Sequence, residues 1–416
     1  MEIRAIRDDE FDTFLAVTED AFGEPPSKEG AERVVLRASL ELDRTRAAYG
    51  GKRQVGSSAA YSLQVSVRGG SAAMAGISWV GVAPGHRRRG VLRAMMTALM
   101  DQAREREEPL AGLYASEWPI YGRFGFGMAV PQATIRVSLA SARPAATRDA
   151  EAAEAADEAV AVVDAAEAAP LLAPVYEAVA AQRSGITSRS EDWWRIVLHD
   201  FSEDRKELGH RRCAVSRSDG AVDGYVLYHF KADWSRDALP TGKVSVAELV
   251  STSPRATAAL WRHVLDTDLA SGLEAYWRPV DDPLPLLLAD PRRARVSVRD
   301  GLFVRVLDLP SAFAARTASA EAAVRIDVRD ELVDANNGTW RISAPDGAGA
   351  ALSCARDGRG AAQLVCDVSA LGACYLGGES ALRLLDAGVV SGDPQAARRL
   401  DALLATDRMP WNVAEF

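Results

Sequence analysis

Residues 80–93 form the stretch VGVAPGHRRRGVLR, which decides the fold expected for this chain. Its first residues are typical of a β-strand, Pro84 and Gly85 predict a turn, and the apolar run after Gly90 predicts a helix. A strand that feeds a helix through a tight turn directs unpaired backbone N–H groups and the positive end of the helix dipole at one spot. Three consecutive arginines add charge, and Gly90 lets the backbone approach a pyrophosphate closely. The stretch predicts a phosphate-binding loop, although an arginine-rich surface turn would have the same residues.

The spacing Arg87-x-x-Gly90 resembles the acyl-CoA pyrophosphate loop of the GNAT superfamily of N-acetyltransferases. That loop usually runs Q/R-x-x-G-x-G/A, and Leu92 departs from its last position. Apolar periodicity and breakers predict the surrounding elements in the order β-α-α-β-β-β-α-β. The last two elements of this order are a helix expected at 91–105 and a strand expected at 110–114. It resembles the acetyltransferase layout, with the loop where that layout requires it.

Composition describes a folded protein of several domains. The chain has 416 residues, which predicts about three domains, and 48% hydrophobic residues. A net charge of −9 argues against a nucleic-acid-binding protein. No apolar stretch approaches the roughly 18 residues of a membrane span, and the first ten residues lack a signal-peptide core, so a cytoplasmic location is expected unless an export route exists that the sequence does not show. The four cysteines and five histidines lack metal-ligand or disulfide spacing, so buried thiols and no metal are expected.

We expect three domains, at residues 1–145, 146–290 and 291–416. The composition of 138–169 shifts to Ala, Glu and Asp, which is typical of a linker. The stretch VSVAELVSTSPRA at 244–256 then repeats the strand, Pro turn and helix of the first domain without the R-R-x-G element. We interpret this as an internal duplication in which only the first copy keeps the cofactor loop; chance similarity between two α/β segments is the alternative.

The third domain is expected to be β-rich. The proline-rich run WRPVDDPLP at 277–285 and the breaker DPRR at 290–293 precede it. Strands are predicted at 296–307, 323–328, 338–343, 350–355 and 361–368, and helices at 371–375, 380–385 and 396–405.

A second motif narrows the resemblance. Residues 115–127 read ASEWPIYGRFGFG, in which glycines allow tight bends and aromatic rings face a cleft or core. Together with the loop at 80–93, the DDPLP junction and the terminal Phe416, this motif resembles the Eis (enhanced intracellular survival) family of multi-acetylating aminoglycoside acetyltransferases. The likeness spans the whole chain. It implies an α/β (α+β) fold of two tandem GNAT-like domains followed by a sterol-carrier-protein-like α+β domain.

The resemblance also implies catalytic residues. In similar proteins the tyrosine of the second motif protonates the departing CoA thiolate, which makes Tyr121 the general acid. The C-terminal carboxylate, here that of Phe416, is the general base. Because an exposed α-carboxyl has a pKa of about 3.3–3.7, this tail must be buried, and Trp411 and Phe416 could anchor it. A tyrosine that only packs, and a frayed chain end, are the ordinary alternatives.

Acetyl-CoA is the implied co-substrate. The backbone of Val80, Gly81 and Val82 would pair with its pantetheine amide. The remaining cofactor residues would surround the pyrophosphate and the thioester: Arg88, Arg89, Gly90, Val91, Leu92, Arg93, Ser116 and Glu117. Ordinary strand pairing and solvated charge are the alternatives.

The resulting expectation is an acetyl-CoA-dependent N-acetyltransferase that uses no acetyl-enzyme intermediate. The resemblance implies acetylation of aminoglycosides at several amines, and hence antibiotic resistance, together with lysine side chains as further acceptors. Phe22, Glu24 and Glu415 could line the acidic acceptor cleft. A homohexamer, built as a dimer of trimers, is also implied. A lipid-binding module with a vestigial transferase domain is the alternative function, and a transcriptional or scaffolding protein is disfavoured by the acidic charge.

Overall fold

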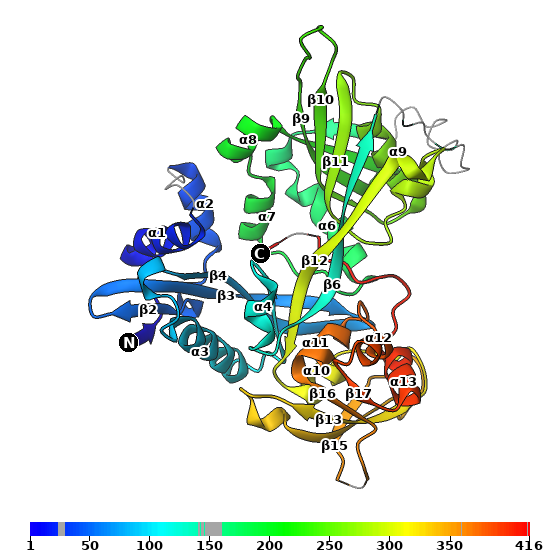
Figure 1. Ribbon diagram of the computed structural model, residues 1–416. Helices are drawn as coiled ribbons and strands as arrows, with labels where there is room; N and C mark the ends of the chain where they lie inside the picture. The colour runs from blue at the N-terminus through cyan, green and yellow to red at the C-terminus, as the bar shows by residue number, and fades with distance from the viewer. Residues whose placement is uncertain (24–29, 140–141, 143–144, 146–159, 359, 414) are drawn as a thin grey trace.

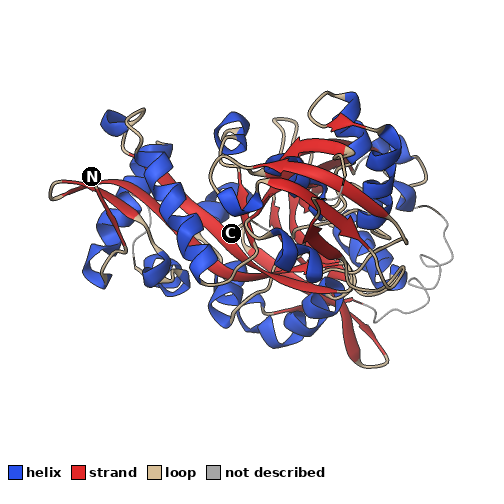
Figure 2. Cartoon of the chain, turned by 90° about the horizontal axis from the view of Figure 1, so that it is seen from below, coloured by secondary structure: helices blue, strands red, loops and turns tan. Residues whose placement is uncertain are grey.

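The computed structural model describes residues 1–23, 30–139, 142, 145, 160–358, 360–413 and 415–416. A single long sheet runs through most of the molecule, and helices pack along it (Figures 1 and 2). In the described residues this sheet contains, in spatial order, β1 (Glu2–Arg4), β2 (Ala47–Gly50), β3 (Arg53–Val67), β4 (Gly70–Val82), β5 (Leu110–Tyr114), β12 (Ala294–Val306), β6 (Gly127–Ser138), β11 (Ala270–Arg278), β10 (Gly242–Ser251), β9 (Ala221–Lys231), β8 (Arg211–Ser218) and β7 (Val160–Val163).

The first unit has the predicted element order. Its helices are α1 (Phe11–Phe22), α2 (Ala31–Ser39), α3 (Val91–Glu105) and α4 (Trp118–Gly122). Strand β4 pairs with β3 in an antiparallel manner and with β5 in a parallel manner. Helix α3 crosses between β4 and β5 and buries Met96 and Leu99 against the sheet. The predicted bounds of this helix and of β5 are confirmed, because their apolar periodicity reflects a real buried face.

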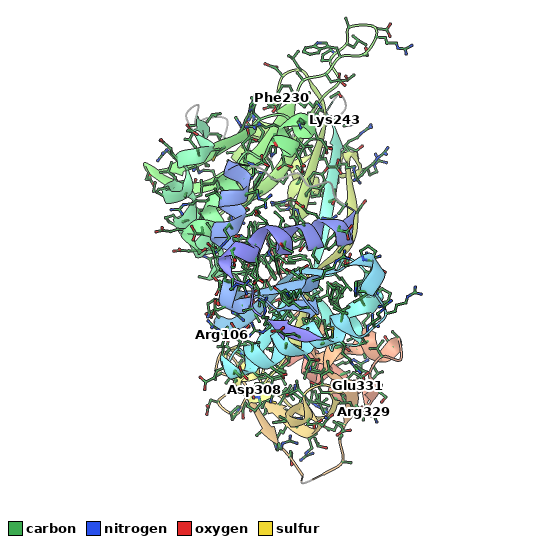
Figure 3. All side chains as sticks on the ribbon, turned by 90° about the vertical axis from the view of Figure 1, so that its left-hand side faces the viewer. Arg106, Phe230, Lys243, Asp308, Arg329 and Glu331 are labelled. Carbon is green, nitrogen blue, oxygen red and sulfur yellow. The ribbon has the colours of Figure 1, made fainter. Side chains whose placement is uncertain are left out.

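The second unit repeats this arrangement. Helices α6 (Ala169–Ala180), α7 (Glu191–Leu198), α8 (Ser202–Leu208) and α9 (Pro254–Leu265) surround strands β7 to β11. Helix α9 connects β10 to β11, which run parallel, as α3 connects β4 to β5. The predicted turn of the β8–β9 hairpin lies at Asp219 and Gly220, which both have positive φ values of 51° and 80°. Phe230 and Lys243 lie where β9 and β10 adjoin in this unit (Figure 3).

Strand β12 joins the parts of the molecule. It pairs with β5 along Leu302–Val306 and with β6 along most of its length, while β6 also pairs with β11. In the sequence, β12 begins after the domain boundary expected at residue 290. In the structure it lies inside the large sheet, between β5 and β6. We keep the three-domain division as a proposal, with β12 as the strand that the third domain contributes to the other two.

The third unit is α+β, as predicted. Its sheet has the order β15 (Ser353–Arg356), β14 (Gly338–Ser343), β13 (Ala323–Arg329), β16 (Leu364–Asp367) and β17 (Ser391–Gly392). Its helices are α10 (Leu309–Ala314), α11 (Val368–Tyr375), α12 (Ala381–Asp386) and α13 (Pro394–Leu404). The strand predicted at 361–368 spans only Leu364–Asp367, and α11 begins directly after it at Val368. Asp308, Arg329 and Glu331 mark this unit, at the opposite end of the molecule from Phe230 (Figure 3).

The four cysteines are buried and free, as expected. Burial raises the pKa of Cys366 to about 12, so this thiol is protonated at neutral pH. Among the residues that the structure describes, no helix is long and apolar enough to cross a membrane.

Candidate active site

Strands β4 and β5 separate at their carboxyl ends. Their pairing ends at Ile77 and Leu113, whereas β4 continues to Val82. Just beyond this point β4 bulges against β3, and Trp79 adopts a φ of 59°. The edge of residues 80–82 that faces away from β3 therefore lies beyond the last pair with β5. Such an edge can pair with the amide groups of an extended ligand.

The turn after β4 presents the amino end of α3 to this opening. Gly90 precedes the helix with a φ of 80°, a conformation that favours glycine. The first N–H groups of a helix have no partner within the helix, so they are free to bind an anion. Arg87 also lines the opening, and its Nη2 atom donates to the Ala21 carbonyl at 2.9 Å. This contact ties the turn to the last turn of α1.

A cavity of about 810 Å³ lies at this opening. Its lining includes ten predicted cofactor residues: Val80, Gly81, Val82, Arg88, Gly90, Val91, Leu92, Arg93, Ser116 and Glu117. Arg89, which was predicted with them, is not part of the lining. The cavity thus gathers a strand edge, a helix amino terminus and four arginines, Arg87, Arg88, Arg93 and Arg123.

Tyr121 lines the same cavity. It lies on the one-turn helix α4, which begins at Trp118 and has Pro119 in its first turn, a position where proline costs no hydrogen bond. The side chain is only 5% exposed. Burial raises the pKa of Tyr121, although a hydrogen bond with Ser116 opposes the shift. The phenol is therefore protonated at neutral pH and can act as a proton donor.

The C-terminal tail passes through the middle of the molecule (Figure 1). Trp411 and Val413 are buried in the core of the second unit. Trp411 Nε1 donates to the Trp277 carbonyl at 2.6 Å, and Asn412 Nδ2 donates to the Gly185 carbonyl at 2.7 Å. The expectation that Trp411 anchors the tail agrees with these contacts.

The terminal residue lies beside β4. The Ser78 hydroxyl donates to the backbone oxygen of Phe416 at 3.0 Å. The Phe416 ring packs edge-on against Tyr114 at 5.3 Å, and a Cβ added at Gly76 would lie 3.0 Å from it. Phe416 is half-buried, and its carboxylate is held two residues before Val80 on the strand whose end lines the cavity.

The three residues predicted to contact the acceptor have different surroundings. Phe22 lines the cavity and is 52% exposed. Glu415 has an exposed side chain beside the tail, although desolvation of its carboxylate raises its pKa; its charge in turn helps burial to raise the pKa of Tyr114. Glu24 lies outside the described residues.

The second unit differs from the first at the position that corresponds to the predicted phosphate-binding loop. The amino end of α9 is capped by its own Ser253 side chain, which accepts a hydrogen bond from the Ala256 N–H at 3.1 Å. Arg255 binds Asp223 at 2.9 Å. Because these groups satisfy one another, this helix terminus offers less to a phosphate than that of α3 does.

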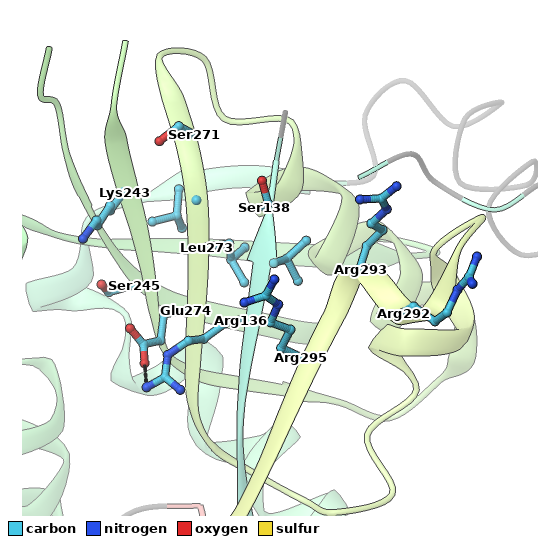
Figure 4. A pocket seen from close by; sticks show the side chains of 13 residues that line it. Arg136, Ser138, Lys243, Ser245, Ser271, Leu273, Glu274, Arg292, Arg293 and Arg295 are labelled. Atoms are coloured by element: carbon cyan, nitrogen blue, oxygen red, sulfur yellow. Dashed lines mark ion pairs between the residues drawn. The ribbon is translucent and has the colours of Figure 1, made fainter. Parts of the chain in front are cut away.

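A separate cavity of about 500 Å³ lies on the second unit (Figure 4). Arg136 on β6 pairs with Glu274 on β11 at 2.5 Å, and Asp290 pairs with Arg292 and Arg293. This second cavity lies at the amino end of β10. Helix α9 begins beyond the carboxyl end of that strand, so the cavity does not correspond to the cofactor opening of the first unit. This cavity contains none of the predicted site residues.

Three contacts in the site were not expected from the sequence. The residues are Arg87, which holds the turn to α1; Ser78, which binds the chain end; and Arg305, whose contacts are described below. Ser78 and Arg305 both lie within strands, and nothing in the neighbouring sequence indicates that their side chains bind distant segments. The arginine run did signal a special loop, but not that Arg87 and Arg88 line the cavity while Arg89 does not.

Comparisons with known proteins agree with this geometry. Residues 2–129 and residues 185–306 each match an acetyltransferase (GNAT) domain family, and residues 309–413 match a sterol carrier protein domain family. An uncharacterized N-acetyltransferase of Streptomyces avermitilis is 36% identical over 99% of this chain and 98% of its own length. The N-acetyltransferase Eis of Mycobacterium tuberculosis is 33% identical over 82% of this chain and 80% of its own. The crystal structure of Eis1 from Mycobacterium abscessus superposes with a TM-score of 0.83, at 31% identity and complete coverage of both chains.

The fold and the cavity define a GNAT N-acetyltransferase, an enzyme class that takes its acyl group from acyl-CoA. Two such domains precede a sterol-carrier-protein-like domain. The chain belongs to the Eis family of N-acetyltransferases.

Proposed function

We propose that the protein transfers acetyl groups from acetyl-CoA to amines of aminoglycosides, at more than one position, and to lysine side chains. The observation that carries this proposal is the cavity that combines the Gly90 turn with Tyr121. The chain end lies beside β4, the strand whose last residues line this cavity. Aminoglycoside acetylation would make the protein an antibiotic-resistance enzyme.

The cofactor binds by its phosphates and its amides. The amino end of α3 and the guanidinium groups of Arg88 and Arg93 face the pyrophosphate, because all of them supply hydrogen-bond donors to the cavity. The edge at residues 80–82 pairs with the pantetheine. The acetyl thioester then lies near Ser116 and Tyr121.

Transfer proceeds directly within a ternary complex. The carboxylate of Phe416 accepts a proton as the substrate amine attacks the thioester carbon. The carbon–sulfur bond breaks, and the Tyr121 hydroxyl gives its proton to the CoA sulfur. The raised pKa of Tyr121 keeps that proton in place until the thiolate forms.

The acceptor enters from the side of the chain end. Glu415 is exposed next to Phe416 and supplies negative charge for a polycation. Phe22, which lines the cavity, completes the proposed wall, and Glu24 stays a proposal from the sequence. The protein would work in the cytoplasm as a homohexamer, arranged as a dimer of trimers. No feature of the described residues favours the lipid-binding alternative, because the apolar residues of the third unit pack into a core that they share with β3, β4, β6 and β12.

A change at the chain end tests the proposal. Adding Gly-Ser-Gly after Phe416 converts its carboxylate into a neutral amide and places the new terminal carboxylate three residues away. Kanamycin-dependent release of CoA thiol should therefore be almost abolished. Acetyl-CoA affinity, measured by calorimetry, should be retained because the cofactor cavity lies in the first unit. The matched control carries the same three residues at the N-terminus. Full activity of a folded C-terminally extended enzyme would refute the role of the carboxylate.

A further inference from the structure

A buried ion pair lies behind the loop that carries Tyr121. Arg305 on β12 donates from Nη2 to both carboxylate oxygens of Asp330, at 2.7 and 2.8 Å. Their side chains are 1% and 0% exposed. Burying two charges is costly, and an apolar pair of similar size would often be as stable. The pair therefore calls for an explanation other than stability.

The free branch of the guanidinium reaches the Tyr121 loop. Arg305 Nη1 donates to the Phe124 carbonyl, three residues after Tyr121. The same segment folds back on itself, because the N–H groups of Phe124 and Phe126 both bind the Tyr121 carbonyl, at 3.0 and 3.3 Å. One side chain of β12 thus fixes the turn that follows the proposed acid.

A second residue of β12 supports the start of the loop. Phe303 lies two positions before Arg305, so both side chains point to the same face of the strand. The Phe303 ring packs edge-on against Trp118, the first residue of α4, with ring centroids 4.9 Å apart. Strand β12 therefore contacts the segment on both sides of Tyr121.

Asp330 is itself immobilised by the third unit. Its carboxylate accepts hydrogen bonds from the N–H groups of Leu332 and Val333 at 3.0 and 3.1 Å, and from Asn336 Nδ2 at 2.9 Å. Its own N–H donates to Asn337 Oδ1 at 2.7 Å. A carboxylate with this many partners has one position, and it imposes that position on Arg305.

The glycines of the motif are explained by this packing. A Cβ at Gly125, whose φ is 79°, would lie 1.7 Å from Arg305 Nη1. A Cβ at Gly127 would lie 1.9 Å from the carbonyl oxygen of Ser369 on α11. The loop approaches the third unit so closely that only glycine fits at both places.

We infer that Arg305, held by Asp330, is a positioning residue that sets the location of the Tyr121 hydroxyl. The third unit thereby controls proton donation in a cavity to which it contributes no lining residue. This inference rests on the proposed role of Tyr121. It assigns Arg305 no contact with substrate.

The test compares two buried arginine–carboxylate pairs. Asp330→Asn keeps the shape of the side chain and weakens the hold on Arg305. Glu108→Gln is the matched control, because Arg44 binds Glu108 at 2.6 Å through both branches, with side chains 0% and 7% exposed. This pair lies near the start of β5 rather than its carboxyl end. We expect kcat with kanamycin to fall by about tenfold to a hundredfold in Asp330→Asn, since small displacements of a catalytic group have such effects. The dissociation constant of acetyl-CoA should change by less than about twofold in both variants, and kcat should be retained in Glu108→Gln.

A double-mutant cycle shows whether the effect passes through Tyr121. Asp330→Asn should lower kcat much less in a Tyr121→Phe background than in the native enzyme, because the group being positioned is already absent. If Tyr121→Phe is fully active, the proposed acid is wrong and this inference falls with it. If Tyr121→Phe is inactive but folded Asp330→Asn has native kcat, the proposed function stands and the inference alone is overturned.

A charge-neutral variant separates positioning from stability. Arg305→Met combined with Asp330→Asn leaves no unpaired buried charge and keeps an acceptor for the backbone of 332–333. We expect its melting temperature to stay closer to the native value than that of Asp330→Asn, while kcat remains reduced. Hydrogen exchange of residues 118–127 should be faster in this variant and unchanged in Glu108→Gln, a readout that needs no acceptor. Native exchange and native kcat in the neutral variant would overturn the inference.

Discussion

Arg88 and Arg89 are neighbours in the sequence, but only Arg88 lines the cavity. Both side chains are exposed. Since a backbone turn points successive side chains in different directions, a run of arginines does not contribute uniformly to an anion site. Arg88 and Gly90 have positive φ values of 60° and 80°, so this turn places both residues in the left-handed conformation, which favours glycine.

Arg88→Ala should weaken acetyl-CoA binding more than Arg89→Ala does. A charge-assisted hydrogen bond is worth about 1.5–3 kcal/mol when shielded and less in solvent, so we expect a loss of about three- to tenfold for Arg88. Calorimetric titration of acetyl-CoA into both folded variants measures this. Equal affinities in the two variants would refute the assignment of Arg88 to the pyrophosphate.

Tyr121→Phe removes one hydroxyl from a buried ring. Because the ring packing is preserved, the fold and the acetyl-CoA affinity should be retained, while kcat falls by about 10² to 10⁴. Steady-state thiol release with kanamycin gives kcat. A phenylalanine enzyme with native turnover would show that Tyr121 only packs and that another group protonates the thiolate.

At the scale of elements, the site depends on contacts between parts far apart in sequence. Helix α4 is one turn long, which is too short to be stable by itself. It is held by β12 through Phe303 and Arg305, and the chain end is held by β4 through Ser78. Loss of any of these contacts should affect catalysis before it affects the fold as a whole.

The pair behind α4 should make stability depend on pH. Burial opposes ionisation of Asp330, but the charge of Arg305 and the Asn336 amide hold its pKa below the ordinary value. A lowered pKa in the folded state stabilises the protein above the unfolded-state value, near 4, and this contribution is lost as the pH falls through the folded-state value.

The melting temperatures of native enzyme and Asp330→Asn should therefore differ most near neutral pH and converge below about pH 4. Asp101→Asn, a change at an exposed position of α3, serves as the control and should follow the native curve. A difference that stays constant from pH 7 to pH 3 would contradict a stabilising charge on Asp330.

At the scale of the whole molecule, two apolar side chains of the large sheet are exposed to solvent. Val296 and Val298 on β12 are 44% and 63% exposed. They lie on the large sheet where β12 pairs with β6. Such a surface is suited to contact between copies of the chain.

The proposed hexamer predicts a mass of about six times 44.6 kDa in solution. Multi-angle light scattering at micromolar concentration measures it directly, and Val298→Asp should lower the mass if this surface takes part. A native protein that elutes at the mass of one chain would refute the hexamer.

The sequence by itself determined the local features: the strand, turn and helix of the cofactor loop, the bounds of α3 and β5, and the repeated arrangement in the second unit. These follow from periodicity, glycine and proline, which act over a few residues. The motif around Tyr121 was recognisable from its resemblance to the Eis family. The order of β15 and β16 within the third sheet could not be predicted from the sequence, because short strands take their partners from packing.

Only the tertiary structure decided which distant groups meet. It placed β12 between β5 and β6, carried the C-terminal tail through the second core to Ser78, and set Arg305 and Asp330 behind Phe124. Each of these contacts joins residues separated by tens or hundreds of positions. No local propensity encodes such a pairing, because it is fixed by the burial of whole faces and by charges that need a partner once water is excluded.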